Sequence, residues 1–315
     1  MTGFSILTQL LQSVLVVVVA PLFLGWVNQC RAWLQNRKGA GILQPYRVLH
    51  KLLNKDAIVA DNTSWIFRYS PYVQFGCMWL AATLVPVLAA NLPLSRAADV
   101  IALVGVFAVA RMFASLAAMD TGTAFGALGA RREMFVAALA EPAMLIIFFN
   151  LSLISQSTSL STIVEAMAYR QLALYPSLAF AAVAFLMVLL AENARIPVDN
   201  PATHLELTMI HEAMILEYSA RHLALIEWAT AIKLMVYFTI GIALFVPWGI
   251  AGAESWTAIA IAVAWLAAKL AAAGAGLALL ETVTAKMRIF RAPEFVATAF
   301  LLAMLGLLLH FVLQQ

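Results

Sequence analysis

The stretch Glu192-Asn-Ala-Arg195-Ile-Pro197-Val-Asp199, continued to Tyr218, lies between two segments that are apolar enough to cross a bilayer. Ionisable side chains next to hydrocarbon are costly, and membrane proteins keep them there mainly for function. The stretch, taken as the acidic loop 192–222, is therefore the first place to look for a site. It contains five carboxylates and two histidines, namely Glu192, Asp199, Glu206, Glu212, Glu217, His204 and His211.

The composition of the whole chain indicates the class of protein that surrounds this loop. The 315 residues are 64% hydrophobic and 11% charged, which leaves too little polar surface to cover a soluble globule. A bilayer crossing needs about 20 apolar residues, and they must be helical because lipid offers backbone groups no partners. We predict an all-α polytopic membrane helix bundle, one domain over residues 1–315, with about eight transmembrane helices at roughly 5–27, 72–92, 99–118, 134–155, 172–191, 225–248, 256–280 and 294–313.

The basic residues predict how the bundle is oriented. Fourteen of the 19 Lys and Arg residues follow the first, third, fifth or seventh expected span, and only Arg96 and Arg170 lie in the opposite segments. By the positive-inside rule the fourteen face the cytoplasm, so both termini lie outside. The remaining three, Arg111, Lys233 and Lys269, lie within expected spans.

Several function classes receive no support from the residues. A net charge of +3 reflects the cytoplasmic loops and gives no reason to invoke nucleic acid. The two cysteines, Cys30 and Cys77, are too few for an iron–sulfur cluster. No Ser-His-Asp order, phosphate loop or metal-ligand spacing stands out, so we expect no metal and no cofactor in this chain.

Three connections are expected to form helices of their own. In the cytoplasmic loop 28–71, Leu49, Leu52 and Leu53 alternate with basic residues, which predicts an amphipathic helix on the membrane face. In residues 156–171 the apolar pattern suggests a small interfacial helix. After Asp199, capping residues predict a helix that continues to about Tyr218.

Glu141 is the clearest candidate for proton handling inside a span. A carboxylate that faces an apolar bundle can load and release protons near neutral pH. It also directly precedes Pro142, which interrupts the helical hydrogen bonds and can admit water. The alternative is a structural glutamate paired with Arg131 or Arg132.

The basic residues within spans need carboxylate partners or a route to the interface. For Lys233 we expect a relay or pairing role, and Glu227 is one candidate partner. Lys269 lies in an alanine-rich run, which favours interhelical pairing. Arg111 is expected to anchor acidic neighbours such as Asp120.

In the acidic loop, Glu192 and Arg195 are one turn apart and can pair, either as an inert anchor or as part of a site. Few basic residues lie nearby in sequence, so several of the acids must find distant partners or share protons. A fully solvated acidic loop is the alternative, and the apolar residues between the acids argue against it.

Two long motifs resemble those of a known family. The first motif is Arg37-Lys-Gly-Ala-Gly-Ile-Leu-Gln44-Pro45-Tyr46-Arg47 with Lys51-Leu52. The second motif is Ala194-Arg195-Ile-Pro197-Val-Asp199 with Glu206-Leu207 and Glu217-Tyr218-Ser219. Both resemble segments of subunit 1 of respiratory complex I and of its relatives in membrane-bound nickel–iron hydrogenases. A third stretch resembles the hydrogenase-4 and formate hydrogenlyase branch of this family. It consists of Asp120-Thr121-Gly122-Thr-Ala-Phe125, Gly129-Ala-Arg131-Arg132-Glu133 and Glu141-Pro142.

The resemblance implies a subunit of an oxidoreductase complex that carries no redox centre itself. Its partners would be hydrogenase-like large and small subunits with a NiFe centre, a ferredoxin-like iron–sulfur subunit, and antiporter-like membrane subunits, in a bacterial or archaeal cell membrane. By position, Glu192, Arg195, Asp199, Glu206, Glu212 and Glu217 would line an inner cavity, and Glu141 would lead into the membrane. Partner docking would involve Arg37, Gln44, Pro45, Tyr46, Arg47 and Lys51.

The chain departs from the family at two carboxylate positions, where it has Ala202 and His204. A histidine can still relay a proton, whereas an alanine cannot. The leading hypothesis is an anchoring and coupling subunit of an energy-converting hydrogenase-like complex that moves protons or sodium. The alternatives are a quinone-site subunit of a respiratory NADH dehydrogenase, a purely structural anchor, and a self-contained transporter.

Overall fold

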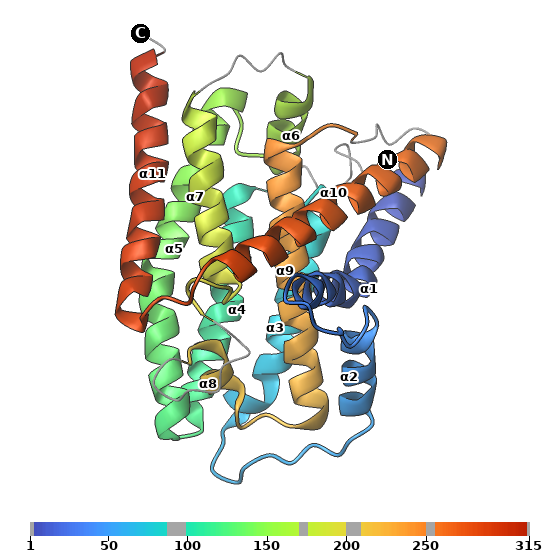
Figure 1. Ribbon diagram of the computed structural model, residues 1–315, viewed down its shortest axis with the longest axis vertical. Helices are drawn as coiled ribbons and strands as arrows, with labels where there is room; N and C mark the ends of the chain where they lie inside the picture. Colours follow the sequence, from blue (N-terminus) through green and yellow to red (C-terminus); the bar gives the residue numbers. More distant parts are fainter. Residues whose placement is uncertain (1–2, 87–98, 170–175, 200–208, 250–255, 314–315) are drawn as a thin grey trace.

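Long apolar helices make up most of the computed structural model, which describes residues 3–86, 99–169, 176–199, 209–249 and 256–313 (Figure 1). No β-strand occurs in these ranges. The helices are α1 (Gly3–Leu34), α2 (Gln44–Leu53), α3 (Trp65–Leu84), α4 (Val100–Asp120), α5 (Ala124–Ser155), α6 (Leu160–Tyr169), α7 (Pro176–Glu192), α8 (His211–Ile215), α9 (Ala220–Phe245), α10 (Trp256–Val283) and α11 (Ala292–Leu313), with a short 3₁₀ turn, η2 (Ile289–Arg291).

The predicted membrane bundle is confirmed as a fold class. Six described helices, α1, α4, α5, α9, α10 and α11, are long and apolar enough to cross a bilayer. Each of the other two expected spans also overlaps a helix, α3 or α7. The expected bounds were wrong for the second span, because α3 begins at Trp65 rather than near residue 72, and for the fourth, because α5 begins at Ala124.

Caps in the sequence account for where three of these helices begin. The side chains of Ser64, Asp99 and Thr123 accept hydrogen bonds from backbone N–H groups in the first turns of α3, α4 and α5. Such caps satisfy donors that have no partner within the helix. Thr123 explains the early start of α5.

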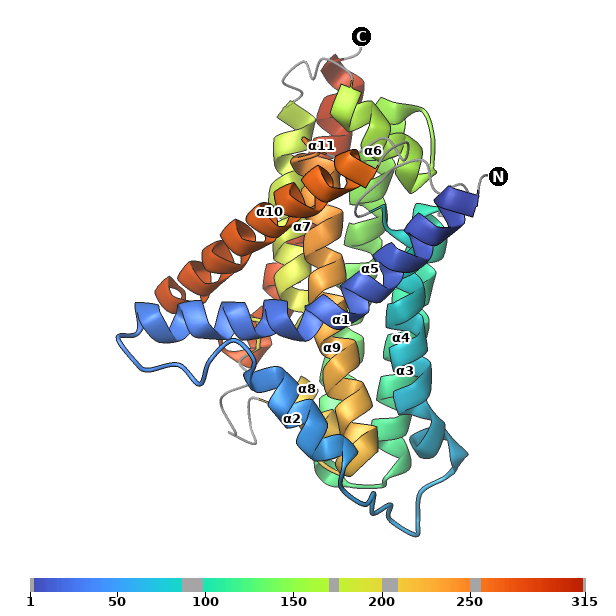
Figure 2. The ribbon, with the colours of Figure 1, turned by 90° about the vertical axis from the view of Figure 1, so that its right-hand side faces the viewer.

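The packing places α9 in the middle of the molecule. Helix α9 contacts α1 on one side and α3 and α7 on others, while α11 packs against α5 and α7. Helices α1 and α10 contact each other and cross the bundle obliquely, and α1 is bent (Figure 2). Pro21 lies inside α1, where its missing N–H group weakens the helical ladder and permits the bend.

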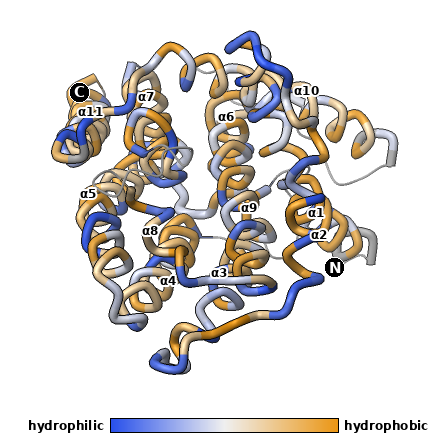
Figure 3. Tube along the Cα trace, turned by 60° about the horizontal axis from the view of Figure 1, so that its bottom comes forward, coloured by the Kyte–Doolittle hydropathy of each residue, from blue (hydrophilic) through white to orange (hydrophobic). Residues whose placement is uncertain are grey.

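The polar segments gather away from the helix bodies. Figure 3 shows mostly hydrophobic helices with hydrophilic residues mainly in the connections. The start of α1 and the end of α11 lie in the upper half of Figure 2, whereas α2 lies in the lower half. The side of a membrane on which the two termini lie stays a prediction.

The expected loop helices are confirmed in two of three places. Helix α2 is the predicted amphipathic helix, and its Leu49 is buried against the bundle. Helix α6 is the predicted helix of residues 156–171, although Leu160, Ile163 and Val164 are fully buried in the protein core instead of facing lipid. The helix predicted from Asp199 to Tyr218 was wrong in its described part, because α8 ends at Ile215. Its expected start at Asn200 and Pro201 lies outside the described residues.

Candidate functional site

Five charged side chains from four helices meet in the interior of the bundle, and we call them the central cluster: Arg111 on α4, Glu133 and Glu141 on α5, Glu192 on α7 and Lys233 on α9. Arg111 occupies the centre. Its Nη1 lies 2.7 Å from Oε1 of Glu141, and its Nη2 donates to Oε2 of Glu192. Its Nε lies 3.7 Å from Oε1 of Glu133.

Lys233 completes the central cluster from the opposite side. Its Nζ lies 3.1 Å from Oε2 of Glu192 and also donates to the backbone carbonyl of that residue. The side chains of Arg111 and Glu192 are only 7% and 4% exposed, so these charges are withdrawn from solvent. Buried charges of this kind persist only when they are paired and hydrogen-bonded. Among the described residues, the central cluster therefore joins three carboxylates to two cations.

Two cavities border the central cluster. A cavity of about 60 Å³, which we call the polar cavity, is lined by Arg111, Glu133, Lys233 and His211, the last from α8, together with apolar side chains of α3, α4, α8 and α9. Its volume and its polar lining suit water molecules. On the other side, a groove of about 430 Å³ between α4 and α5 is lined by Arg111 and Glu141. The charged groups thus bridge the space between the acidic loop and the α4–α5 groove.

Glu141 occupies the boundary between the central cluster and this groove. Its side chain is 35% exposed, whereas the other two carboxylates of the cluster are largely buried. Pro142 follows it inside α5 and has no N–H group to donate to the carbonyl of Ala138, which also lines the groove. The carbonyl oxygen of Ala138 therefore lacks its usual helical donor near Glu141.

A second group of charges, which we call the inner clamp, consists of Arg31, Arg195 and Glu281. Nη1 of Arg195 lies 3.3 Å from Oε1 of Glu281, and Nη1 of Arg31 lies 3.4 Å from Oε2 of the same carboxylate. The Glu281 side chain is 1% exposed. The inner clamp therefore ties the end of α1, the segment after α7 and the end of α10 together.

Asp199 holds the beginning of the acidic loop in place. Its Oδ1 lies 3.1 Å from Nζ of Lys286, and its Oδ2 accepts hydrogen bonds of 3.3 Å from the N–H groups of Ile210 and His211. A carboxylate at the first N–H groups of α8 satisfies donors that lack helical partners. The described part of the loop is thus packed on the bundle, and a fully solvated loop is wrong for it.

His211 is a titratable group of this loop that lies beside the polar cavity. Burial holds the pKa of its imidazole below the ordinary value, opposed by the nearby carboxylates of Glu227 and Asp199 and reinforced by the ammonium of Lys233. The neutral imidazole is consequently favoured. A neutral histidine can accept a proton on one side and release it on the other.

Several expected pairings were wrong in their partners. Arg111 pairs with three carboxylates of the central cluster and not with Asp120, whose Oδ2 accepts a 2.7 Å hydrogen bond from the N–H of Ser64. Lys233 pairs with Glu192 instead of Glu227. Glu192 does not pair with Arg195, because that guanidinium contacts Glu281. Glu141 contacts Arg111 rather than Arg131 or Arg132, and Arg132 donates to the carbonyl of Met209.

The remaining predicted residues are placed as follows. Lys269 does make an interhelical contact, with the carbonyls of Val246 and Trp248 beyond the end of α9. Glu217 is exposed, and Glu212 is partly buried. His204, Glu206 and Ala202 lie outside the described residues. Sequence reasoning missed Glu133, Glu281, Arg31 and Lys286 as site residues, although Glu133 stands two helical turns before Glu141 and Glu281 directly follows the expected span 256–280.

The segment predicted to dock partners divides into two groups. Tyr46 donates its hydroxyl to the carbonyl of Val18 and fastens α2 to α1. Arg37, Gln44 and Pro45 line a cavity between the same helices. Arg47 and Lys51 are exposed.

The fold and the buried charges together define a multi-pass membrane protein with an internal ionic network. The model of the NADH dehydrogenase family matches residues 7–312, and the chain belongs to this family, which is related to subunit 1 of complex I. The resemblance expected from the motifs is confirmed.

Individual relatives agree with this assignment. Formate hydrogenlyase subunit 4 of Escherichia coli strain K12 is 33% identical over 304 residues, which cover 96% of this chain and 97% of the relative. Hydrogenase-4 component C of the same organism is 32% identical over 248 residues, 78% of this chain and 77% of the relative. The solved structure of the membrane-bound sulfane sulfur reductase, an archaeal respiratory membrane complex, contains a chain of the same fold, with a TM-score of 0.79, 18% identity, and coverage of 96% and 98%.

Proposed function

We propose that this chain is the membrane anchor and coupling subunit of an energy-converting, hydrogenase-like complex. In this role it links electron transfer in a soluble arm, which carries a NiFe centre and iron–sulfur clusters, to the movement of protons or sodium ions through antiporter-like subunits. The names of the two curated relatives, a formate hydrogenlyase subunit and a hydrogenase-4 component, support this class of complex. The observation that carries the coupling role is the position of the central cluster between two cavities.

The charge balance of the central cluster supports proton storage. Its three carboxylates face two cations, so one negative charge has no opposite charge among the described residues of the cluster. An unbalanced charge in a low-dielectric interior is unfavourable, and neighbouring carboxylates relieve it by sharing a proton. The proton then belongs to the cluster as a whole rather than to one residue.

The proposed route begins at His211 and the polar cavity and continues to Glu133. From there the proton passes along the carboxylates around Arg111 and leaves at Glu141, the most exposed of the three. Arg111 stays charged and keeps the carboxylates within reach of one another. His204 and Glu206 would extend the route toward the soluble arm.

Substitution of Glu141 tests the proposal. Glu141→Gln keeps the shape of the side chain and leaves Arg111 paired with Glu192, so we expect the complex to assemble. Coupled ion movement should fall at least about tenfold, because the exit carboxylate is lost. The measurement is ion uptake into vesicles that contain the complex, together with electron transfer and assembly.

The matched control is Asp61→Asn, which removes an exposed carboxylate from the loop before α3. It should leave ion movement unchanged. Normal ion movement in an assembled Glu141→Gln variant would refute the route. The short contact between Glu141 and Arg111 favours one alternative, a purely structural anchor, and that alternative predicts this result.

A further inference from the structure

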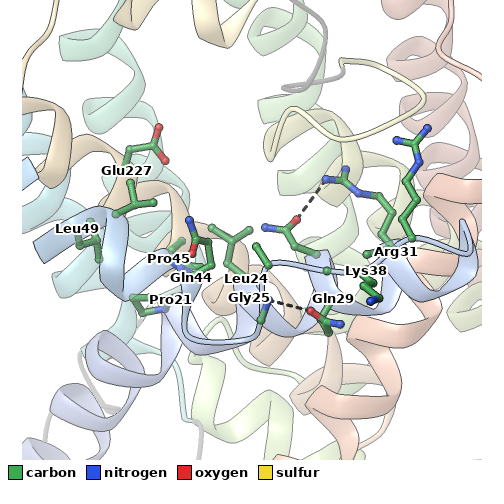
Figure 4. Close-up of a pocket in the computed structure, with 18 of the residues that line it drawn as sticks. Pro21, Leu24, Gly25, Gln29, Arg31, Lys38, Gln44, Pro45, Leu49 and Glu227 are labelled. Carbon is green, nitrogen blue, oxygen red and sulfur yellow. Dashed lines mark hydrogen bonds between the residues drawn. The ribbon is translucent and has the colours of Figure 1, made fainter. Parts of the chain in front are cut away.

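A cavity of about 490 Å³ lies between α1, the segment after it, α2 and α9 (Figure 4). One part of its lining is mainly apolar and includes Leu24, Pro45 and Leu49, with Glu227 on the same side (Figure 4). The other part is polar and carries the cations Arg31, Arg37 and Lys38. A cavity that is apolar at one side and cationic at the other suits a ligand with an apolar body and an anionic head.

The cationic part has an excess of positive charge. Glu281 contacts both Arg31 and Arg195, so its one carboxylate balances only one of the two guanidiniums. Arg37 and Lys38 add two exposed charges, and Glu227 is the acidic residue of the lining. An anion bound beside Arg31 would neutralise charge that the described part of the protein leaves unbalanced.

The basic segment is held firmly against α1. The N–H of Gly41 donates a 3.1 Å hydrogen bond to Oε1 of Gln29. Gly39 packs so closely on the Gln29 side chain that a Cβ atom there would collide with it, and Gly25 approaches the carbonyl of Ile42 in the same way. The glycines thus allow a close contact that holds the backbone carrying Arg37 and Lys38 beside the cavity, which lowers the entropy cost that a ligand must overcome.

Two tryptophans of α1 near this cavity are of the kind found at membrane surfaces. Trp33, at the end of α1, is 57% exposed and packs edge-on against Trp26 with ring centroids 5.9 Å apart. Tryptophans of this kind concentrate at the level of the lipid headgroups. Helix α2 buries Leu49 and exposes Arg47 and Lys51, as expected of a helix that lies along the interface.

We propose that this cavity binds an anionic phospholipid, with its phosphate between Arg31, Arg37 and Lys38 and an acyl chain along Leu24, Pro45 and Leu49. Basic pockets between membrane helices on the positively charged side are typical sites for acidic lipid headgroups. The bound lipid links α1 to the segment that precedes α2. This site is separate from the central cluster and does not depend on ion movement.

Binding to the delipidated full-length chain in detergent tests the site. Native mass spectrometry would compare phosphatidylglycerol with phosphatidylcholine, and we expect the anionic lipid to bind at least about tenfold more tightly. Arg37→Gln combined with Lys38→Gln should weaken phosphatidylglycerol binding about 25-fold, since each basic residue near a lipid surface contributes about a factor of five. Val48→Trp, which fills the apolar part without a change of charge, should weaken it as well.

The matched control is Arg47→Gln combined with Lys51→Gln, which removes the same charge from the exposed face of α2 and should change binding less than about twofold. Equal losses in both double variants would overturn the proposal in favour of general surface attraction. Equal binding of the two lipids would overturn it too. Inorganic phosphate that binds as tightly as the lipid would show a site for free phosphate, and a quinone analogue that binds while phosphatidylglycerol does not would show a quinone pocket.

Discussion

At the residue scale, Arg111 decides the geometry of the site. A guanidinium offers five donors in a rigid plane, and here it donates hydrogen bonds to Glu141 and Glu192 and lies within ion-pair distance of Glu133. A lysine lacks the planar fork that directs separate N–H groups at Glu141 and Glu192. This single side chain explains why Glu133, Glu141 and Glu192, which are distant in sequence, form one unit.

His211 gives the acidic loop a dependence on pH. Because burial lowers the pKa of its imidazole, the folded loop binds a proton less readily than the unfolded chain does. The contribution of neutral His211 to the stability of the folded loop is therefore fully present above the ordinary histidine pKa of about 6.5. It is lost as the pH falls from there through the lowered pKa of the folded state. Hydrogen exchange of residues 209–218 should show this loss between pH 7.5 and 5.5, after correction for intrinsic exchange rates.

In the variant His211→Gln, which stays neutral at both pH values, the protection of residues 209–218 should no longer depend on pH in this range. Helix α6, which contains no histidine and has no part in this contact, serves as the internal reference. An equal loss of protection in the variant would show that another group titrates.

At the element scale, the end of α7 determines where the motif after Glu192 points. Ala194 adopts a positive φ of 49°, and the N–H of Arg195 then donates to the carbonyl of Leu190 at 2.9 Å. This is the reversal that commonly ends a helix, usually with glycine at the left-handed position. It turns Arg195 away from Glu192 and toward Glu281.

Ala194→Gly should therefore stabilise the protein by roughly 0.5–1 kcal/mol, because a left-handed conformation is unfavourable for a residue with a Cβ atom. The measurement is thermal unfolding in detergent. Ala191→Gly, three residues earlier and within α7, should destabilise the protein by about 1 kcal/mol, since glycine is a poor helix former. A lower melting temperature for Ala194→Gly would contradict the argument.

At the scale of the whole molecule, the inner clamp joins parts of the chain that are far apart in sequence. Arg31, Arg195 and Glu281 come from the first, middle and last thirds of the chain and meet at a buried carboxylate. If this carboxylate is neutralised, two guanidiniums lose their opposite charge while they remain partly or fully buried. Such a loss is strongly destabilising in protein interiors.

Glu281→Gln should lower the free energy of unfolding by about 3 kcal/mol and expose residues 284–291 to limited proteolysis. Glu294→Gln, at the beginning of α11, is the matched control and should leave both properties nearly unchanged. Unaltered proteolysis in the Glu281→Gln variant would mean that packing alone holds these helix ends.

The sequence by itself determined the membrane bundle, the approximate position of its helices and the family, because long apolar runs and contiguous motifs are local properties of a chain. It also identified Glu141, Glu192, Arg111 and Lys233 as charges that need partners within the bundle. Only the tertiary structure decided which partners they have, and it added Glu133 and Glu281. Charged groups pair across helices that the chain separates by tens of residues, so their contacts depend on how the helices pack and turn, and a local feature such as the left-handed Ala194 can redirect them.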